Sequence, residues 1–340
     1  MLGSTSGYLG SERVDPSRRE STWSLDQMVG EGSTHGFRLI RVDPSNPCVS
    51  YRPMPLVNDD DLVYGVVVPP PKGADGKVDP SFMEAAGLAA KQLDEVRPDL
   101  FKSGRKNLTD EDHRRGQFPV KAVGISFGGG QERPKRIYHA APVLNTINTL
   151  LGALCFIRLA QHASSAFRSW APCLYEYYAQ AMRTLKERDP SLQFNFFGSI
   201  WACCTFNFGP RTVTVEHLDH LNYLFGWCGI TALGEFDYSK GGHLILWDLQ
   251  AVIEFPPGWT ILIPSAYLRH SNTDIGDGET RFSFTQYTAG GLFRYLDDDG
   301  HVRRKMSPKE KKEAEARQKS RISTGLNLYS TLQQLRSSSI

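Results

Sequence analysis

A histidine and an aspartate stand two positions apart in this chain of 340 residues, and a second histidine follows after a long interval. His217 and Asp219 form an H-x-D pattern, and His270 lies 53 positions after His217. If His217 ends a strand and Asp219 opens the next loop, both side chains can turn toward one metal ion. Two histidines and one carboxylate are the ligands of non-haem Fe(II) oxygenases, and they leave positions for a cosubstrate and oxygen. The pattern therefore predicts an Fe(II) site with O2 as a cosubstrate.

An arginine and a serine follow the second histidine at a spacing that suits an anion site. Arg281 lies 11 positions after His270, and Ser283 lies two positions further on. Adjacent antiparallel strands joined by a turn of this length would place Arg281 beside the metal, with Ser283 on the same strand face. Arginine holds a carboxylate through two parallel hydrogen bonds. A carboxylate anchor next to an Fe(II) site predicts 2-oxoglutarate as the keto-acid cosubstrate.

Three neighbouring residues compete for these roles. His220 has no carboxylate two positions further on, and His243 lies only 27 positions before His270. We interpret His243 as a structural residue or as a support for the ligands. Arg269 is the alternative anchor for the cosubstrate. It directly precedes a predicted ligand, however, so it should face away from the metal on an alternating strand.

The elements that must position these residues form a β-rich region. From residue 199 the apolar residues alternate with period two, and turns rich in Gly and Pro separate the runs. The predicted strands are Ser199–Phe208, Thr212–His217, Gly226–Gly234, His243–Asp248, Ala251–Phe255, Trp259–Pro264, Tyr267–Ser271 and Arg281–Thr288. Short strands in such a run are typical of a sandwich, a barrel or a jelly roll.

The residues before this region are expected to supply helices. The apolar spacing predicts helices over Pro80–Val96, Pro142–Ala163 and Ala171–Glu187, and a strand over Leu62–Val68. We therefore expect an α+β protein with a double-stranded β-helix core, of the jelly-roll or cupin-like kind, and helices packed outside it.

Three regions are expected along the chain. Residues 1–50 are rich in Ser, Gly and Arg, which predicts a flexible arm with at most a short helix at Ser24–Met28. Residues 51–300 should form the dioxygenase domain, with its β core at about 199–290. Residues 301–340 should form a basic helical tail.

Composition and charge exclude several classes of protein. The chain is 40% hydrophobic and 22% charged, which excludes a wholly disordered, collagen-like or coiled-coil protein. No apolar run is long enough to span a membrane, and the N-terminal residues lack the apolar stretch of a secretory signal. The six cysteines form no C-x-x-C pair, so we expect no structural zinc finger and a reduced intracellular compartment.

The net charge of +2 conceals two basic segments. Nine Lys or Arg and three Glu lie between Arg303 and Arg321, and eight Lys or Arg and four acidic residues lie between Arg105 and Arg136. Such asymmetry suggests contact with a polyanion, although solvated surface explains either segment alone equally well.

The basic segment between Arg105 and Arg136 contains a predicted strand that runs into three glycines. The strand and the glycines together span Val123–Gly130. The run matches neither G-x-G-x-x-G nor a mononucleotide P-loop. It is either a plain flexible turn or a loop whose backbone can approach a ligand closely. The second interpretation predicts contacts with a DNA backbone from Gly129, Gly130, Gln131, Lys135 and Arg136.

Several motifs of the β-rich region together resemble the TET/JBP family. They are Gly241–Asp248, Phe255–Gly258, Ile263–Ala266, Arg269–Ser271 and Arg281–Gly291. They look most like the transposon-associated branch found in mushroom-type fungi, and the resemblance extends over about residues 50–300. It implies Fe(II)- and 2-oxoglutarate-dependent oxidation of methyl groups on DNA bases. It also implies that His217, Asp219 and His270 bind iron, and that Arg281 and Ser283 hold the distal carboxylate of 2-oxoglutarate.

The resemblance further implies a pocket for a flipped base. Family members place the base between an aromatic ring and a guanidinium. Tyr287 matches the aromatic ring, and Arg211 matches the guanidinium. Arg211 is also expected to contact the cosubstrate. Asn222 takes the place of a residue that reads the base edge, and its amide can both donate and accept. Two alternatives remain open. Tyr287 could pack in the core, and Arg211 could be a charged residue on the surface.

The substrate implied by the resemblance is double-stranded methylated DNA. The expected activity is oxidation of 5-methylcytosine to its hydroxymethyl, formyl and carboxyl forms by a monomeric nuclear enzyme. N6-methyladenine demethylation, alone or in addition, is the alternative. Three more functions compete with these: an RNA or protein hydroxylase, a non-catalytic DNA-binding remnant of a mobile element, and a cupin-type metal protein, which would not need Arg281.

Overall fold

The strands that follow residue 199 divide between two β-sheets. The residues described by the computed structural model are 21–42, 51–101, 112–113 and 115–337. They form a nine-stranded sheet, a four-stranded sheet and a separate two-stranded hairpin. The two larger sheets face each other across one apolar layer, to which the nine-stranded sheet contributes Val67 and Ile261 and the four-stranded sheet contributes Leu244 and Ile253. This arrangement confirms the expected α+β class with a double-stranded β-helix core.

The nine-stranded sheet is antiparallel and draws strands from most of the chain. Its order is β15-β3-β12-β9-β14-β8-β6-β7, and β2 pairs with β3. The strands are β2 (Met54–Val57), β3 (Leu62–Val68), β6 (Val120–Ser126), β7 (Lys135–Arg136), β8 (Cys203–Asn207), β9 (Cys228–Glu235), β12 (Thr260–Ile263), β14 (Thr280–Tyr287) and β15 (Ser330–Thr331). Alternation along β14 places Arg281, Ser283 and Thr285 on one face, which is the face turned toward the smaller sheet.

The four-stranded sheet has the order β1-β11-β10-β13 and is antiparallel except for the β1–β11 pair. Its strands are β1 (Arg38–Ile40), β10 (Leu244–Leu246), β11 (Ala251–Ile253) and β13 (His270–Asn272). The two-stranded hairpin consists of β4 (Asp112–His113) and β5 (Gly116–Gln117). β13 begins at His270, so this predicted ligand lies where the small sheet meets the interior.

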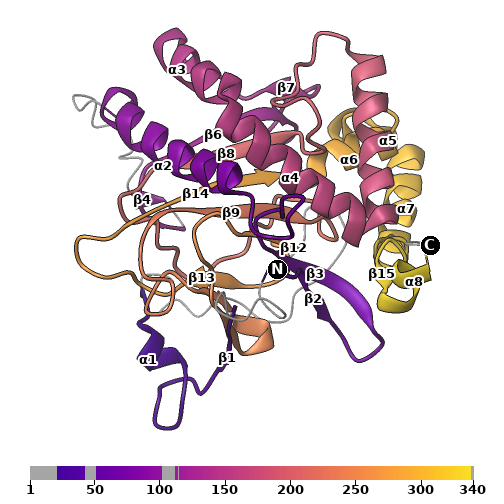
Figure 1. Cartoon of the computed structure of the whole chain (residues 1–340). Coiled ribbons are helices and arrows are strands. Elements are labelled where there is room, and N and C mark those ends of the chain that lie inside the picture. Colours follow the sequence, from indigo (N-terminus) through magenta and orange to yellow (C-terminus); the bar gives the residue numbers. More distant parts are fainter. Residues whose placement is uncertain (1–20, 43–50, 102–111, 114, 338–340) are drawn as a thin grey trace.

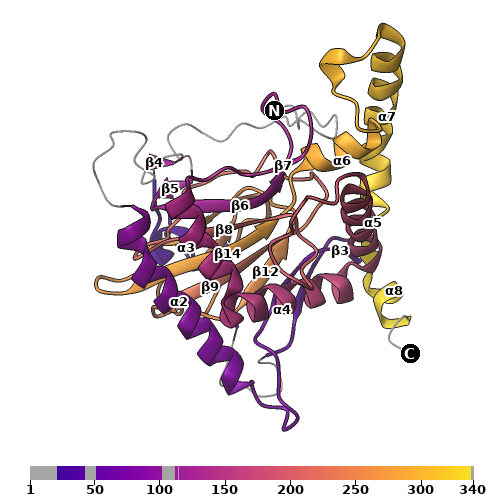
Figure 2. The same cartoon turned by 90° about the horizontal axis from the view of Figure 1, so that it is seen from above.

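Helices cover one face of the nine-stranded sheet, whereas the first short helix lies against the small sheet (Figures 1 and 2). The helices are α1 (Leu25–Met28), α2 (Pro80–Leu100), α3 (Ala141–Gly152), α4 (Leu154–Trp170), α5 (Pro172–Arg188), α6 (Gly290–Asp297), α7 (Pro308–Leu326) and α8 (Leu332–Ser337), with short 3-10 turns at Trp247–Leu249 and Arg303–Lys305. Asp79 caps α2 by accepting from the Ser81 N–H, and Pro80 occupies the first turn, where no intrahelical donor is needed. Phe82 and Leu93 of α2 then pack with Phe156 of α4 against the sheet.

The segment predicted as one helix over Pro142–Ala163 forms two helices instead. α3 ends at Gly152, α4 begins at Leu154, and the two axes are bent by 64°. Ala153 between them has an extended backbone, with φ −74° and ψ 129°. Apolar residues continue at helical spacing through this break, so periodicity alone could not reveal it. No single described helix is long and apolar enough to cross a membrane, although α3 and α4 taken together meet that test.

The strand predicted over Thr212–His217 is also not regular. It contains only isolated bridges at its two ends, between Arg211 and Arg281 and between His217 and His270. Between them, the Val215 N–H donates to the Arg115 carbonyl. The segment therefore passes from one pairing partner to another and forms no continuous ladder.

Part of the predicted N-terminal arm belongs to the small sheet. β1 pairs with β11, and Met28 and Phe37 are buried against Trp247 and its neighbours. The short helix expected near residue 24 is confirmed as α1, which has a Ser24 capping box. Residues 1–20 and 43–50 of the arm lie outside the described residues.

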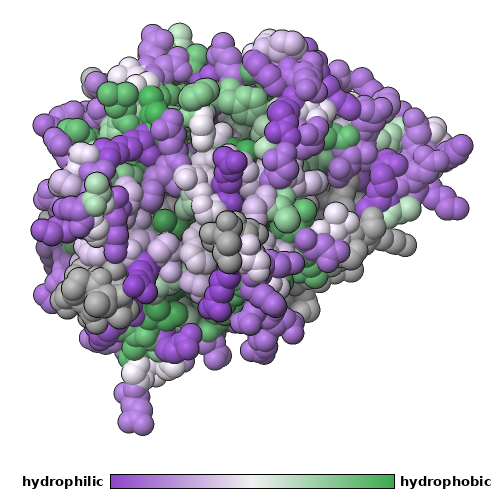
Figure 3. All heavy atoms as spheres, turned by 45° about the vertical axis from the view of Figure 1, so that its right-hand side comes forward, coloured by the Kyte–Doolittle hydropathy of each residue, from purple (hydrophilic) through white to green (hydrophobic). Residues whose placement is uncertain are grey.

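The tail after residue 300 contains α7 and α8, and β15 between them pairs with β3. The tail therefore returns to the nine-stranded sheet. The domain boundaries at residues 50 and 300 stay predictions. On the face of the molecule shown in Figure 3, hydrophilic residues predominate, and apolar residues form only small separate groups.

Candidate active site

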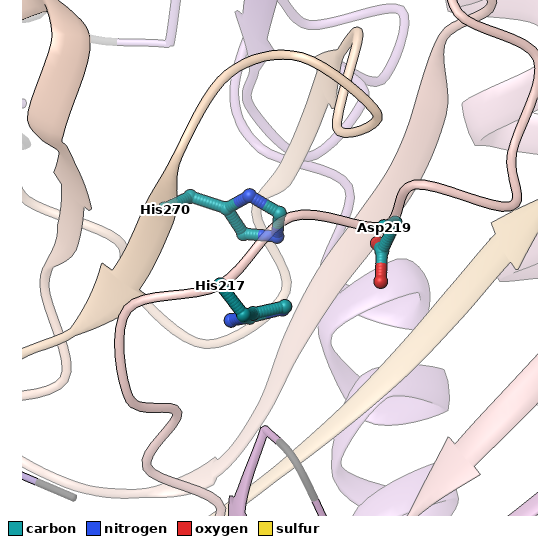
Figure 4. A group of neighbouring side chains, drawn as sticks. All are labelled: His217, Asp219 and His270. Atoms are coloured by element: carbon teal, nitrogen blue, oxygen red, sulfur yellow. The ribbon is translucent and has the colours of Figure 1, made fainter. Parts of the chain in front are cut away.

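His217, Asp219 and His270 lie together inside the β-helix. Each offers a ligand atom, and these atoms all lie within 4.8 Å of one another. All three residues are buried. Figure 4 shows the two imidazole rings side by side, with the Asp219 carboxylate next to them. The described residues contain no other group of three potential ligands so close together.

The backbone sets the distance between the two histidines. His217 and His270 form an antiparallel pair in which each N–H donates to the carbonyl of the other, at 3.1 Å in both directions. Residues paired in this way carry their side chains on the same side. The two ring centroids are therefore only 4.2 Å apart. The Asp219 N–H donates to the Ser265 carbonyl at 2.9 Å, which fixes the third residue at the start of its loop.

Both imidazoles are oriented by the same local hydrogen bond. The Nδ1 atom of His217 lies 2.7 Å from the Val215 carbonyl, and that of His270 lies 2.9 Å from the Leu268 carbonyl. A carbonyl can only accept, so Nδ1 carries the proton in each ring and Nε2 keeps a lone pair for a metal. Burial holds the pKa of His217 well below its ordinary value, and the nearby His270 acts in the same direction. His217 is thus neutral, as a metal ligand must be.

Arg281 lies in the same interior and has no acidic partner among the described residues. Its side chain is among the largest that are fully buried, and it is 1% exposed. Its Nη1 donates to the Thr212 carbonyl, while its buried Nε has no acceptor among the described residues. No described Asp or Glu forms an ion pair with it, and burial alone lowers its pKa to about 10. A buried charge without a counter-ion is costly, so this guanidinium suits an anionic ligand.

A glycine makes room for this arginine. Gly242 has φ +71°, and a Cβ there would lie 2.6 Å from the Phe236 ring and 3.3 Å from Cδ of Arg281. The absence of that carbon lets the Phe236 ring lie under the guanidinium, with 5.8 Å between the ring centroid and Cζ. Gly242, in the motif Gly241–Asp248, therefore makes room for the predicted anchor.

A polar cluster that the sequence did not indicate lies beside Arg281. Asn207 on β8 stands opposite Ser283 on β14, and its Nδ2 donates to Ser283 Oγ at 2.9 Å and to Thr285 Oγ1 at 3.3 Å. Its Oδ1 is buried without a partner in the described structure. The strand register brings Asn207 there, and register was not readable from β8 alone.

One narrow cavity connects the metal ligands to Arg281. Its lining residues are Arg115, Phe118, Asn207, Thr214, His217, Asp219, Ile230, Leu244, His270, Asn272, Arg281, Ser283 and Thr285. Its volume is about 30 Å³, the size of a site for one water molecule. A larger ligand must displace some of these side chains.

Arg115 is the second residue that the sequence reasoning missed. It follows β4 and lines the cavity, with its Nη1 3.9 Å from Asp219 Oδ1. Its side chain is 20% exposed, so it lies between the cavity and the solvent. Its charge also acts on the Tyr287 phenol. The only sequence signal was its membership of the basic segment 105–136.

The Arg211 side chain contacts an outer loop. Its guanidinium bonds to the Asp274 carboxylate and to the carbonyls of Ile275 and Gly276. It is not among the residues that line the cavity. The structure therefore shows no contact between Arg211 and this cavity, and its role beside the cosubstrate or the base stays a prediction. The bridge with Arg281 places the Arg211 backbone beside β14, while its side chain reaches the outer loop.

Tyr287 and Asn222 lie near the site but outside the cavity lining. Tyr287 shares the inward face of β14, hydrogen-bonds with Thr205, and has a pKa raised above its ordinary value by burial. Asn222 is buried, and its Nδ2 donates to Ser265 Oγ at 3.3 Å. Their contact with a base stays a prediction.

The competing residues have other partners. Arg269 faces outward, with ion pairs to Asp248 at 2.6 Å and Glu216 at 3.4 Å. His243 is buried and lies 3.0 Å from Thr273 Oγ1 through its Nδ1. Burial lowers the pKa of His243 to about 4. These contacts agree with the interpretation of His243 as structural and of Arg269 as facing away from the metal.

The predicted DNA-backbone residues divide into two sets. Gly129, Gly130 and Gln131 line a second cavity on the surface. Arg136 instead directs its guanidinium to Asn148 and Gln193, and Lys135 is exposed. The structure therefore does not gather all five residues around one point.

Comparison with known proteins gives only distant likenesses. No family model matches the chain. No curated protein matches it either. Among solved structures, NgTET1 in complex with 5mC DNA aligns at 14% identity and a TM-score of 0.39, over 69% of this chain and 75% of that one. A 2OG-Fe(II) oxygenase family oxidoreductase from Burkholderia pseudomallei aligns at 16% identity and a TM-score of 0.30, over 66% of this chain and 82% of that one. These likenesses are too weak to assign a family, so the function must be argued from the site.

Proposed function

We propose that this protein is an Fe(II)- and 2-oxoglutarate-dependent dioxygenase that oxidises methylated bases in DNA. One observation carries the proposal: a two-histidine, one-carboxylate ligand set shares a cavity with a fully buried arginine that forms no ion pair with any described acidic residue. The first element suits Fe(II) with open coordination positions. The second suits the carboxylate of a cosubstrate. A cupin-type metal protein has no need of the second element.

The residues present fit both groups. His217 and His270 present unprotonated Nε2 atoms, and Asp219 supplies a carboxylate oxygen. When bound, Fe(II), 2-oxoglutarate and O2 together supply the oxidant that inserts one oxygen atom into a C–H bond and yield succinate and CO2. The protein must hold the cosubstrate in one orientation and keep water out of the site.

Arg281 would receive the distal carboxylate of 2-oxoglutarate. Its free Nε edge provides a donor, and Ser283, held by Asn207, provides a hydroxyl on the same face. Such an anion would compensate the buried charge of the guanidinium. Because the cavity measures only about 30 Å³, entry of a five-carbon diacid requires lining side chains to move. Arg115 is the partly exposed lining residue best placed to do so.

A base would approach from the side of Arg115 and Tyr287. A methyl group within a duplex cannot reach a buried metal, so the base must be flipped out of the helix. Tyr287 lies on the inward face of β14 beyond Thr285, and the charge of Arg115 acts on its phenol. We assign to Arg115 the guanidinium role that the sequence assigned to Arg211. A ring and a guanidinium can stack on the two faces of a base, whatever its identity.

The substrate that we propose first is 5-methylcytosine, oxidised stepwise to the hydroxymethyl, formyl and carboxyl forms. N6-methyladenine is the second candidate, because Asn222, next to the site, can both donate and accept hydrogen bonds. The motif resemblance and the two basic segments support DNA rather than protein as the substrate. The same proposal has three further parts. The protein belongs to the TET/JBP branch found in mushroom-type fungi, it is a monomer, and it acts in the nucleus.

Succinate release with defined duplexes tests the function. Purified protein with Fe(II), ascorbate and 2-oxoglutarate should release succinate faster with a duplex containing 5-methylcytosine than with the same duplex unmethylated. Mass spectrometry of the DNA should show the oxidised base. An N6-methyladenine duplex is the parallel arm. Equal succinate release in all arms would disprove a methylated-DNA substrate, and no release from any substrate with iron bound would disprove the oxygenase.

A further inference from the structure

A second cavity lies on the surface between the glycine loop and the start of the C-terminal tail. Its volume is about 220 Å³, and it is lined by Phe127, Gly128, Gly129, Gly130, Gln131, Arg294, Asp298, His301, Val302, Arg303 and Arg304. Figure 2 shows α6 close to β7, the strand that follows this loop in the chain. Three arginines and one aspartate give the lining a positive balance, so the cavity suits an anion.

The glycine loop offers backbone donors to this cavity. Gly128, Gly129 and Gly130 have φ of +150°, +55° and +89°, and a Cβ on any of them would meet nothing within 4 Å. Gln131 closes the loop, because its Oε1 accepts from the Gly128 N–H and its own N–H donates to the Gly128 carbonyl. The N–H groups of Gly129 and Gly130 have no acceptor within the described chain. Successive N–H groups in such a turn form a concave anion site.

Ion pairs connect the start of the tail with Glu132, which follows the glycine loop, and with Asp298 at the end of α6. Glu132 contacts Arg304 at 3.1 Å and Lys305 at 2.8 Å, and Asp298 holds Arg303 at 2.8 Å. Both pairs of Glu132 are largely exposed, with more than half of each side chain in solvent. Exposed pairs of this kind contribute little and exchange readily. A phosphate could therefore replace Glu132 as the partner of Arg304.

Backbone contacts connect the lining of this cavity with the loop that carries the metal ligand Asp219. Asn222 in the Asp219 loop forms a bridge with Ala289, and the Leu221 carbonyl accepts from the Gly290 N–H at 2.9 Å. The next residue, Gly291, lies so close to Phe127 that a Cβ would be 2.1 Å from its carbonyl oxygen. Phe127 directly precedes the glycines. The loop of the metal ligand, the start of α6 and the residue before the glycine loop are therefore packed against one another.

We propose that this cavity binds a backbone phosphate of duplex DNA next to the base in the active site. The N–H groups of Gly129 and Gly130 and the guanidinium of Arg304 would donate to the phosphate. The inference rests on the proposed function, because it takes DNA as the partner. It assigns the first turn of the C-terminal tail, around Arg303–Lys305, to the DNA-binding surface, and it leaves Arg136 outside that surface.

A pair of substitutions at one glycine tests the site. Asp and Asn are the residues that tolerate the left-handed conformation of Gly129 best, and the space around it is open. Gly129→Asp places a negative charge in the cavity, whereas Gly129→Asn is its neutral isostere. Duplex binding should be measured by fluorescence anisotropy over a series of salt concentrations. Gly129→Asp should weaken binding by about fivefold or more and lower the salt slope by about one unit, while Gly129→Asn stays within about twofold.

Two further variants keep the test decisive if Gly129→Asp unfolds. Arg304→Gln should lower the salt slope in the same way. Lys91→Gln removes an equal charge from the exposed face of α2, where Lys91 pairs with Glu95, and it should leave the slope unchanged. Equal effects of Gly129→Asp and Gly129→Asn, or of Arg304→Gln and Lys91→Gln, would overturn the proposal. Binding of inorganic phosphate alone as tight as that of DNA would show a site for free phosphate and would overturn it as well.

Succinate release separates this proposal from the proposed function. If the oxygenase activity were absent, no duplex would stimulate succinate release, yet the salt slope would still fall in Gly129→Asp. If the phosphate site were absent, the unmodified protein would release succinate with methylated DNA and the slope would not change. With both correct, Gly129→Asp should raise KM for DNA and leave kcat at saturating DNA unchanged.

Discussion

Two arginines on neighbouring segments of the β-helix have opposite surroundings. Arg269 faces outward from the small sheet and contacts two carboxylates, those of Asp248 and Glu216. Arg281 faces inward from β14 and contacts a carbonyl and an aromatic ring but no carboxylate of the described residues. A protein can retain a desolvated charge either by pairing it internally or by leaving it for a ligand. The difference agrees with a structural role for Arg269 and with the proposed role of Arg281 as the partner of an anionic cosubstrate.

The largest effect should come from the metal ligand. Asp219→Ala leaves two histidines, which hold Fe(II) poorly, so succinate release should fall more than about 100-fold. Iron content measured after anaerobic loading and gel filtration should fall with it. Asp274→Ala removes a carboxylate from the outer loop and is the matched control, with near-normal activity. Activity of Asp219→Ala close to that of the unmodified protein would disprove the metal site.

The paired substitutions Arg281→Met and Arg269→Met test the comparison directly. Arg281→Met should raise KM for 2-oxoglutarate by about 100-fold, because a fully desolvated charge pair is lost. Its Tm should stay level or rise, because an uncompensated charge leaves the interior. Arg269→Met should lower stability by about 1–3 kcal/mol, because it removes a cationic partner of the buried Glu216, and it should leave that KM unchanged.

Arg281→Lys refines the same test. Lysine keeps the charge but loses the planar fork, so KM for 2-oxoglutarate should rise far more than KM for DNA. Thermal unfolding with and without 2-oxoglutarate provides an independent measurement. If Arg269→Met impairs cosubstrate binding and Arg281→Met does not, the two roles are reversed.

A smaller effect on cosubstrate binding is expected from the polar residues beside Arg281. Asn207→Leu and Ser283→Ala should each raise KM for 2-oxoglutarate by about five- to tenfold, since the Asn207 amide orients the Ser283 hydroxyl. The double substitution should cost little more than either alone, because both remove the same hydrogen bond. Fully additive effects in this double-mutant cycle would show that the two residues act separately.

The smallest effect should come from Arg211. Arg211→Gln breaks a partly exposed pair with Asp274 and should cost at most about 1 kcal/mol of stability, with activity unchanged. Arg115→Gln should instead weaken activity on methylated duplex. The opposite result, activity lost in Arg211→Gln and kept in Arg115→Gln, would restore the assignment made from the sequence.

The sequence was sufficient to predict those features in which the local pattern determines where a side chain points. Alternation in the strands and the spacing of His217, Asp219, His270 and Arg281 were enough to predict one site, because a strand fixes which side chains share a face. The class of fold followed from the same alternation. Arg281 could be distinguished from Arg269 because Arg269 directly precedes a ligand on an alternating strand.

The sequence failed where contacts depend on distant partners. Asn207 joins the site only through the register of β8 against β14, and Arg115 only through the hairpin that precedes β6. Arg211 was expected beside the cosubstrate, but its side chain contacts Asp274 and the carbonyls of Ile275 and Gly276 in a loop that is distant in sequence. The bend at Ala153 was hidden because apolar spacing continues through it. In each case the deciding information lies in tertiary pairing.

The mutual backbone hydrogen bonds of His217 and His270 have a consequence for how such sites change through evolution. The spacing of the two ligands is set by a single antiparallel pair, at 3.1 Å in each direction, and not by the length of chain between them. Loops within that interval can therefore be lengthened or shortened while the ligand geometry is preserved. A search for relatives that requires a fixed interval after the H-x-D pattern would overlook proteins with the same site. The invariant to look for is the pairing of the two histidine backbones.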